Sequence, residues 1–299
     1  MSIFRIAVLM TSFNRREFTL RALRRLYAQR GLDALRVTVF LVEDGCADGT
    51  GEAVLAEFPN VRLLHGDGSL YWNRGMRMAF TAALAEGFDA YLLLNDDTML
   101  EGDALRRMVD VSAAQAANGE TAIVVGSTRL PGTGALSYGG IRLRKRGLSV
   151  RLEKITPGAA NAIACDTMNG NIVLIPAEIA HVVGNLEARF HHHFGDLDYG
   201  FRARRAGFAV VIAPGYLGEC GTNSVRGTWR DATLPLRKRW KNLQSPKGQP
   251  FAQWMLFTRR HYGWRWLLYA CSPYVKTILS GLLLHRRGVV RSQDALSAE

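Results

Sequence analysis

The stretch YLLLNDDTML, residues 91–100, places two adjacent carboxylates directly after a run of leucines. Residues 91–94 have the character of a strand buried on both faces, which is a short apolar run bounded by turn signals. Asp96 and Asp97 therefore lie where the chain leaves a sheet, and their charges repel each other. Two explanations are open at this point. One carboxylate caps a helix that begins near Glu101, or a divalent cation turns the repulsion into attraction.

Apolar strands alternate with helical patterns over the first hundred residues. The expected strands span 3–10, 36–42, 61–65 and 90–94, and the expected helices span 14–29 and 73–87. Asn14 and Glu17 have the spacing of a capping pair for the first helix. The alternation predicts an α/β fold with a mixed, mainly parallel sheet and helices on both faces. Ligands bind such sheets at the carboxyl ends of the strands, where the aspartate pair lies.

Positive charge is concentrated at the end of the chain. The whole sequence carries a formal net charge of +12. Residues 221–299 contain 14 basic and 3 acidic residues, a balance of +11, whereas residues 1–220 contain 24 and 23, a balance of +1. We therefore expect one domain over 1–220 and a basic, aromatic-rich helical region over 221–299. The asymmetry points to an anionic partner, either a membrane or a nucleic acid.

Cysteine spacing and the first residues of the chain bear on its compartment. The four cysteines show no CxxC spacing, and the chain enters its first expected strand without a signal segment. The cytoplasm is therefore the expected compartment. The most apolar segment, 266–284, has Pro273 and Lys276 near its middle. We expect this segment to lie at a membrane interface and not to span the bilayer.

Four polar segments follow one another along the chain. They are MTSFNRRE (10–17), VEDGCADGT (42–50), LNDDTML (94–100) and FGDLDYGFRARRAG (194–207). In this order and at these distances they resemble the family 2 glycosyltransferases, which have a GT-A-type fold, over about residues 4–215. The resemblance implies a nucleotide-sugar-binding half at 1–100 and an acceptor half at 101–220. It also implies Mg²⁺ or Mn²⁺, bound by one or two carboxylates and by phosphate oxygens.

The resemblance implies roles for the residues at the strand ends. Asp97 is the expected direct metal ligand, and Asp96 faces the ribose or a metal-bound water. Asp44 contacts the nucleotide base, although Glu43 stands where the family has the first of two aspartates. Phe13 stacks on that base. The residues implied for the nucleotide sugar are Thr11, Phe13, Asn14, Asp44, Trp72, Asn73, Asn95 and Asp96.

The segment GDLDYGFR, residues 195–202, offers the base that accepts a proton from the acceptor hydroxyl during inverting transfer. Asp196 matches the family's position better, and Asp198 is the runner-up. Gly195 replaces the glutamate that usually precedes this aspartate. A structural alternative is that an aspartate here caps the helix expected at 197–206.

The segment GDGSLYWNRGMRMAF, residues 66–80, resembles the glycine–aromatic–tryptophan segment of family 2 rhamnosyltransferases. The resemblance makes Trp72 an apolar wall for a sugar and brings Asn73 and Arg74 to the diphosphate at a helix N-terminus. A tryptophan buried in the core is the alternative. The segment MNGNIVLIP, residues 168–176, resembles the family's acceptor-side strand. The acceptor residues implied are Trp72, Gly170 and Asn171.

Arginine and tryptophan are interleaved in RGTWRDATLPLRKRWKN, residues 226–242, and in RRHYGWRW, residues 259–266. This mixture suits an anionic phospholipid headgroup layer, and single-stranded nucleic acid could bind the same composition. The membrane is the preferred partner because lipid-linked acceptors of glycan assembly lie there. The three histidines at 191–193 are interpreted as loop residues and not as a metal cluster.

The residues and the resemblance together predict a glycosyltransferase that is peripheral at the inner face of the cytoplasmic membrane. It would add one sugar from a UDP- or dTDP-sugar, with dTDP-rhamnose favoured, to a glycan or lipid-linked acceptor in cell-surface polysaccharide synthesis. A sugar-phosphate nucleotidyltransferase is the enzymatic alternative, but TSFNRRE lacks the glycine-rich loop that such an enzyme needs. A nucleic-acid-binding protein is the other alternative, and it leaves the acids at three strand ends unexplained. The sequence leaves the sugar, the acceptor and homo-oligomer formation open.

Overall fold

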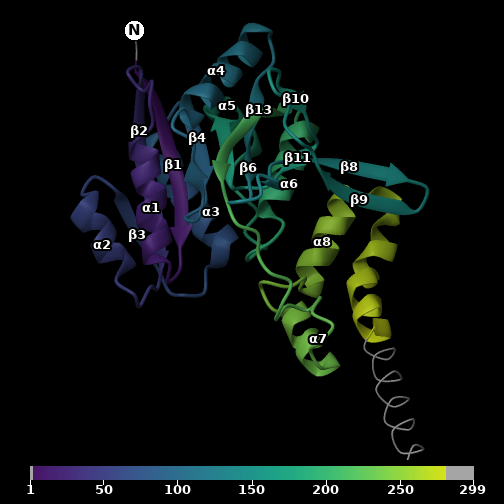
Figure 1. Ribbon diagram of the computed structural model, residues 1–299. Helices are drawn as coiled ribbons and strands as arrows, with labels where there is room; N and C mark the ends of the chain where they lie inside the picture. Colours follow the sequence, from purple (N-terminus) through teal and green to yellow (C-terminus); the bar gives the residue numbers. More distant parts are fainter. Residues whose placement is uncertain (1–2, 281–299) are drawn as a thin grey trace, which may run out of the picture. The chain divides into compact units, whose positions relative to one another are not determined.

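The structure is a computed structural model of the 299-residue chain that describes residues 3–280 (Figure 1). The chain divides into two compact units, Met1–Thr222 and Asn223–Glu299. The first unit contains the four polar segments, and the second contains the basic region. Residues 281–284 of the segment expected at a membrane interface lie outside the described residues, as does the rest of the basic region after them.

The first unit is built on a mixed sheet with the strand order β10-β13-β6-β12-β4-β1-β2-β3, in which β5 pairs with β13 and β7 with β6 (Figure 1). The strands β3, β2, β1 and β4 are mutually parallel, and β12 runs antiparallel between β4 and β6. The strands are β1 (Phe4–Ser12), β2 (Leu35–Asp44), β3 (Arg62–Gly66), β4 (Ala90–Leu94), β5 (Met99–Leu100), β6 (Ala122–Arg129), β7 (Leu136–Tyr138), β10 (Ile163–Ala164), β12 (Ile172–Pro176) and β13 (Ala209–Glu219).

Helices cover both faces of this sheet because its central strands are apolar on both sides. β4 is buried at every position, and its side chains alternate between two cores. Leu92 lies in the core shared with α1, α2 and α4, whereas Leu93 lies in the core shared with α3, α5 and α6. The helices are α1 (Arg16–Tyr27), α2 (Thr50–Glu57), α3 (Tyr71–Glu86), α4 (Ala104–Ala117), α5 (Ala177–Val183) and α6 (Gly195–Arg205). The predicted α/β fold is confirmed.

A smaller antiparallel sheet belongs to the same unit and has the order β11-β8-β9. Its strands are β8 (Gly140–Arg146), β9 (Ser149–Lys154) and β11 (Thr167–Met168). β8 and β9 form a hairpin (Figure 1). β11 leads directly into Gly170 and Asn171, and the Thr167 hydroxyl donates a hydrogen bond to the Leu197 carbonyl of α6 at 2.7 Å. The hairpin is therefore joined to the part of the unit where acceptor residues are predicted.

Two of the predicted helix starts are corrected by the structure. α1 begins at Arg16, and its cap residue Arg15 makes no side-chain capping bond, so Asn14 and Glu17 do not form a capping pair. β5 follows Asp96 and Asp97, and the next helix begins only at Ala104. The aspartate pair therefore caps no helix, and the first of the two explanations for it is wrong.

The second unit contains α7 (Leu236–Gln244), α8 (Phe251–His261), the short η1 (Gly263–Arg265) and a helix over 266–280. Leu243, Phe257 and Tyr262 are buried in its interior. The indole of Trp254 donates a hydrogen bond to the Tyr269 carbonyl at 2.7 Å, which ties α8 to the last helix. No helix within residues 3–280 combines the length and the apolar character needed to cross a membrane.

Candidate active site

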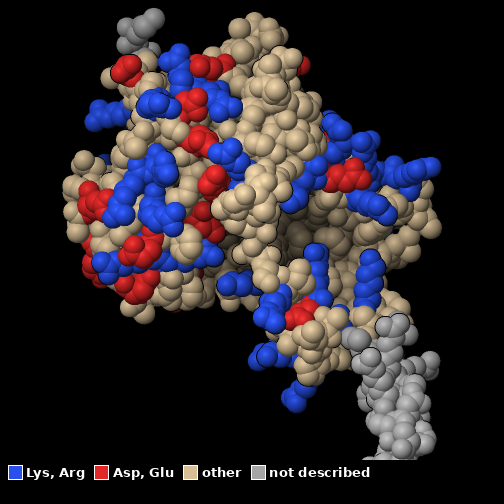
Figure 2. Space-filling model, in the orientation of Figure 1, with Lys and Arg blue, Asp and Glu red and all other residues tan. Residues whose placement is uncertain are grey.

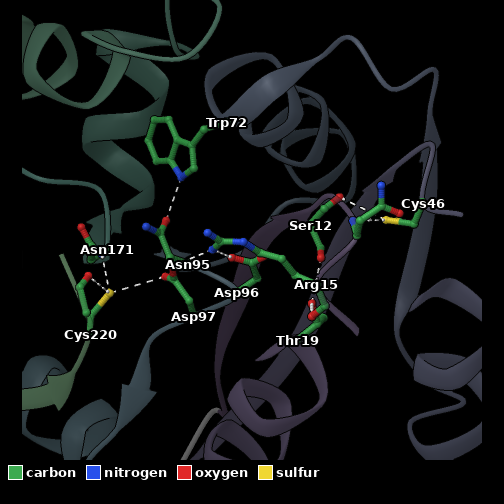
Figure 3. Close-up of polar contacts among 12 residues, drawn as sticks. Ser12, Arg15, Thr19, Cys46, Trp72, Asn95, Asp96, Asp97, Asn171 and Cys220 are labelled. Carbon is green, nitrogen blue, oxygen red and sulfur yellow. Dashed lines mark hydrogen bonds and ion pairs between the residues drawn. The ribbon is translucent and has the colours of Figure 1, made fainter. Parts of the chain in front are cut away.

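Three of the four polar segments, those at 10–17, 42–50 and 94–100, meet at one edge of the large sheet (Figure 3). β1, β2 and β4 are parallel, so the loops that follow them leave the sheet at the same edge. β12 runs the opposite way, and its first residues therefore lie beside the last residues of β4. The amide of Asn95 accordingly donates to the carbonyl of Asn171 at 3.1 Å. This edge gathers residues that are far apart in the sequence into one site.

Asp96 and Asp97 share one cation at this edge (Figure 3). The Nη1 of Arg15 donates to Asp97 Oδ2 at 2.6 Å and to Asp96 Oδ1 at 3.2 Å. Asp96 is only 7% exposed, and this burial raises its pKa to about 6 even though the Arg15 charge lowers it. The pair is thus short of positive charge, because one guanidinium faces two carboxylates.

Cys220 lies on the other side of Asp97 (Figure 3). Its thiol is 3.5 Å from Asp97 Oδ1, and it accepts a hydrogen bond from the Asn171 amide at 3.4 Å. Burial, together with the Asp97 charge, raises the pKa of Cys220 to about 12. The thiol is therefore neutral and donates to the carboxylate. Asn171, predicted as an acceptor residue, is buried, and this sulfur links its side-chain amide to Asp97.

The residues present fit a divalent cation that completes its coordination with substrate. Mg²⁺ and Mn²⁺ commonly bind through one or two carboxylates together with phosphate oxygens and water. Within the described part of the chain, no three His, Cys, Asp or Glu side chains are grouped so that they could enclose a metal ion. A carboxylate pair whose negative charge is only partly offset suits a cation that is bound by one or two carboxylates and by substrate. Asp97, whose side chain is 26% exposed, and Asp96 would hold the ion.

A continuous set of contacts joins the aspartate pair to the predicted base. The indole Nε1 of Trp72 donates to Asn95 Oδ1 at 2.7 Å. The same ring lies against Gly170, where an added Cβ would meet Trp72 Cζ2 at 2.5 Å. The amide of Gly170 donates to Asp196 Oδ2 at 2.9 Å. The predicted donor and acceptor sides are therefore held together by Trp72 and Gly170.

Replacement of Gly170 by alanine is expected to destabilise this arrangement. The new methyl group would push the Trp72 ring away and strain its hydrogen bond to Asn95. Overpacking of this kind lowers the free energy of unfolding by about 1–3 kcal/mol, which urea denaturation measures. Gly221→Ala is the matched control, because a Cβ at Gly221 meets nothing within 4 Å. Equal stability of the two variants would contradict the predicted contact.

The structure separates the two candidate bases. Asp198 is completely buried and its carboxylate is paired with Arg202 at 2.7 Å, so it stabilises α6. Asp196 is partly exposed, and burial raises its pKa while the amides of Gly170 and Leu197 lower it. Neither aspartate acts as a side-chain cap, since α6 has none. The geometry therefore favours Asp196 as the group that faces an acceptor.

The glycine at position 195, where the resemblance implies a glutamate, has a steric reason. A Cβ at this position would overlap Asn73 Oδ1. Asn73 is completely buried, and its amide nitrogen donates to the carbonyls of Glu187 and Phe190 at 2.9 and 2.7 Å. The prediction that Asn73 contacts the donor is not supported by this geometry. Asn73 instead fixes the segment that leads into α6.

Asp44 organises the loop before α3. Its carboxylate accepts hydrogen bonds from the backbone amides of Gly68, Leu70 and Tyr71 at 2.8, 3.0 and 3.1 Å. The side chain is 3% exposed. A contact between Asp44 and the nucleotide base stays a prediction, and the role visible here is to hold the loop that carries Tyr71 into α3.

The remaining predicted donor residues frame the first strand end in different ways. Phe13 is 49% exposed and offers a ring face to a base. Thr11 is buried beneath α3, where a Cβ at Gly75 would overlap its hydroxyl. Asn14 accepts a hydrogen bond from the Ala47 amide at 2.7 Å and joins the loops after β1 and β2. Phe13 is thus the residue of this group best exposed to a ligand.

The histidines at 191–193 lie in a loop that contacts the start of α3. The backbone amide of Asn73 donates to the His191 carbonyl at 3.0 Å, and the backbone amide of Trp72 approaches His192 Nδ1 at 3.5 Å. Arg74, predicted near the diphosphate, has its guanidinium against the His191 ring. Burial and the Arg74 charge lower the pKa of His191. The loop therefore positions Trp72.

Sequence reasoning missed Arg15 and Cys220. Arg15 follows Asn14 in the loop after β1, so a cation at the end of a strand adjacent to β4 was the available signal. Cys220 directly follows β13, which is not adjacent to β4 in the sheet. Its approach to Asp97 depends on the pairing of β13 with the short β5, and no pattern in the sequence predicts that pairing.

Comparisons with known proteins bear on the fold and the family of the chain. No curated protein matches the chain. The crystal structure of TarS from S. aureus has a similar fold, with a TM-score of 0.54 and 11% sequence identity, and the match covers 87% of this chain and 44% of TarS. The chain thus spans less than half the length of TarS, and the likeness concerns the GT-A-type fold alone. A family model described as glycosyltransferase like family 2 matches residues 5–242. Because this match covers most of the chain, the chain belongs to the family-2-like glycosyltransferases.

Proposed function

We propose that the chain transfers a single sugar from a UDP- or dTDP-sugar to a glycan or lipid-linked acceptor, with inversion at the anomeric carbon. The observation that carries the proposal is the set of contacts between Asp196 and the aspartate pair, through Gly170, Trp72 and Asn95. An acid suited to accept a proton and a carboxylate pair suited to a cation are thereby held in one site. The base would serve the attacking hydroxyl, and the cation would serve the departing diphosphate.

Asp196 would accept the proton of the acceptor hydroxyl as its oxygen attacks the anomeric carbon. The new carbon–oxygen bond forms while the bond to the diphosphate breaks, and the bonding pair leaves with the nucleoside diphosphate. A Mg²⁺ or Mn²⁺ ion held by Asp97 and Asp96 would supply the positive charge that offsets the charge developing on this leaving group. The raised pKa of Asp196 strengthens it as a base.

The rhamnosyl specificity is part of this proposal and depends on Trp72. Its ring is fixed by Asn95 and Gly170 and is partly exposed. An indole face suits an apolar sugar surface, and a 6-deoxy sugar such as rhamnose presents a methyl group in place of a hydroxymethyl group. The donor would therefore be dTDP-rhamnose. Competition between dTDP-rhamnose and UDP-glucose for the protein tests this choice, and tighter binding of UDP-glucose would contradict it.

The proposed location is the surface of an anionic membrane. Within 223–280, the second unit has 11 basic residues and one acidic residue. Its last segments also carry apolar side chains that are 40–67% exposed and recur at helical spacing. They are Trp264, Leu267, Leu268, Val275, Ile278 and Leu279. Exposed apolar side chains on one helix, within a unit that is strongly basic as a whole, favour an interfacial position on an anionic bilayer. A lipid-linked acceptor would be reached from this position.

Co-sedimentation with vesicles tests the membrane proposal. The full chain should bind vesicles of phosphatidylcholine and phosphatidylglycerol in equal parts, and binding should fall in high salt because it is partly electrostatic. Leu268→Ser with Leu279→Ser should weaken binding about tenfold, since each leucine contributes apolar burial. Leu55→Ser on α2, a similarly exposed leucine, is the control. Equal binding to pure phosphatidylcholine vesicles would contradict the electrostatic part of the proposal.

A further inference from the structure

The β8–β9 hairpin concentrates positive charge in the first unit. Residues 140–154 contain six basic residues and one acidic residue, a balance of +5. The rest of the first 220 residues then contains 18 basic and 22 acidic residues, a balance of −4. Figure 2 shows Lys and Arg side chains gathered over this hairpin. An almost neutral first unit therefore contains a strongly basic surface.

The hairpin register places like charges opposite each other. Arg144 pairs with Arg151 across the two strands, and Arg142 and Arg146 lie on the same face at positions two residues away. Like charges directly opposite each other destabilise a strand pair. Glu153, the single acid of the hairpin, lies opposite Arg142 in the register, and its carboxylate is 3.2 Å from Arg144. Glu153 offsets only part of this positive charge, and a bound anionic surface would stabilise the excess that remains.

The two faces of the hairpin have different roles. Leu143 pairs with Leu152 on the face opposite the arginines, and Ile141 and Val150 of that face are buried. The turn carries Leu148, which is 62% exposed. An exposed apolar side chain at a turn, next to several arginines, suits the boundary between headgroups and acyl chains. Binding of a soluble polyanion would leave the Leu148 side chain exposed to water.

The hairpin is connected to the acceptor side of the site. β11 pairs with β8 through Thr167 and Met168. The Asn169 amide donates to the Gly139 carbonyl at 3.0 Å just before the hairpin begins, and the next residue, Gly170, donates to Asp196. A surface that held the hairpin would therefore lie at the end of the short sheet that leads to the proposed base.

We infer that the β8–β9 hairpin binds an anionic lipid bilayer, with the face of Arg142, Arg144, Arg146 and Arg151 on the headgroups and Leu148 inserted at the interface. This inference rests on the proposed function only in its suggestion that the acceptor is lipid-linked. It assigns the first unit a membrane contact of its own, distinct from the apolar residues of the last helix. The hairpin orients the acceptor side of the site toward the bilayer.

Neutralising the paired arginines in the full chain tests the inference. Arg144→Gln with Arg151→Gln should lower partitioning onto vesicles of phosphatidylcholine and phosphatidylglycerol about tenfold, because each basic residue near an anionic surface contributes to binding. Arg21→Gln with Arg36→Gln removes the same charge from exposed positions elsewhere in the unit. This control should lower partitioning less than twofold. At high salt, where the electrostatic contribution is screened and the apolar contribution remains, Leu148→Ser should bind vesicles more weakly than the unchanged protein does.

The stability of the double variant shows whether the hairpin is still formed. Removing the opposed arginines takes away a repulsion and also the exposed Arg144–Glu153 ion pair, which contributes little, so the thermal midpoint should stay close to that of the unchanged protein. If Arg144→Gln with Arg151→Gln partitions as the control does, the inference is wrong. The measurement uses no sugar nucleotide, so absence of glycosyl transfer would overturn the proposed function while leaving the hairpin result standing.

Discussion

Asp97→Ala is expected to abolish the cation-dependent turnover of the nucleotide-sugar donor while the fold stays intact. Asp97 has the more exposed carboxylate of the pair, and it would be the direct ligand of the ion. Without this carboxylate the ion would not be held, and the loss of the charge that it would supply to the departing diphosphate should cost several kcal/mol and lower turnover on the order of a thousandfold. Release of UDP or dTDP in the presence of Mn²⁺ measures this loss.

Removal of a surface carboxylate provides the control for Asp97→Ala. Asp110 lies on α4, where it pairs with the exposed Arg106 at 2.8 Å. Asp110→Ala should therefore retain turnover. Circular dichroism should show that Asp97→Ala folds, because Arg15 keeps Asp96 as a partner at 3.2 Å. Undiminished turnover by Asp97→Ala would contradict the assignment of Asp97 as a metal ligand.

Asp196→Asn is expected to lower transfer at least ~100-fold while donor binding persists. The amide has nearly the same shape as the carboxylate but cannot accept the proton of the acceptor hydroxyl. In the unchanged protein, transfer should rise as the pH rises through the raised pKa of Asp196, since the ionised form is the base. Initial rates of transfer, together with donor titration by calorimetry, separate the loss of chemistry from a loss of binding.

Asp198→Asn provides a contrast two residues away. It removes the charge opposite Arg202 in a completely buried position. We expect a loss of about 1.5–3 kcal/mol in the free energy of unfolding, the worth of a hydrogen bond to a charged group, and transfer by the folded fraction should persist. If Asp198→Asn lost transfer and Asp196→Asn did not, the base would have to be reassigned to Asp198.

Local signals in the sequence were sufficient to predict the nucleotide-binding half of the fold. Residues 90–94 form a strand with both faces buried. Its apolar run is continuous, and successive side chains enter the two cores in turn. The parallel arrangement of β1, β2 and β4 follows from the helical segments between them. The strand ends were also predictable, because each apolar run gives way to a polar segment. The aspartate pair was therefore expected at the correct edge of the sheet.

Features that depend on long-range contacts could not be predicted. Asn73 was expected at a ligand because it begins a helix, but the loop at 187–190 covers it and takes up its amide. Cys220 reaches Asp97 through the pairing of β13 with β5, two strands separated by more than a hundred residues. Net charge summed over 1–220 was also misleading, because the basic hairpin at 140–154 and the acidic remainder cancel in that sum.

Incubation with a panel of UDP- and dTDP-sugars, in Mn²⁺ and in excess chelator, measures whether the protein turns over a nucleotide sugar and whether this turnover depends on the cation. One donor of the panel, dTDP-rhamnose if the proposed specificity holds, should slowly release its nucleoside diphosphate to water in Mn²⁺. The release should stop in chelator and be absent for Asp97→Ala. Release that is equal in Mn²⁺ and in chelator would contradict the claim of a cation-dependent glycosyltransferase, as would the absence of release from every donor.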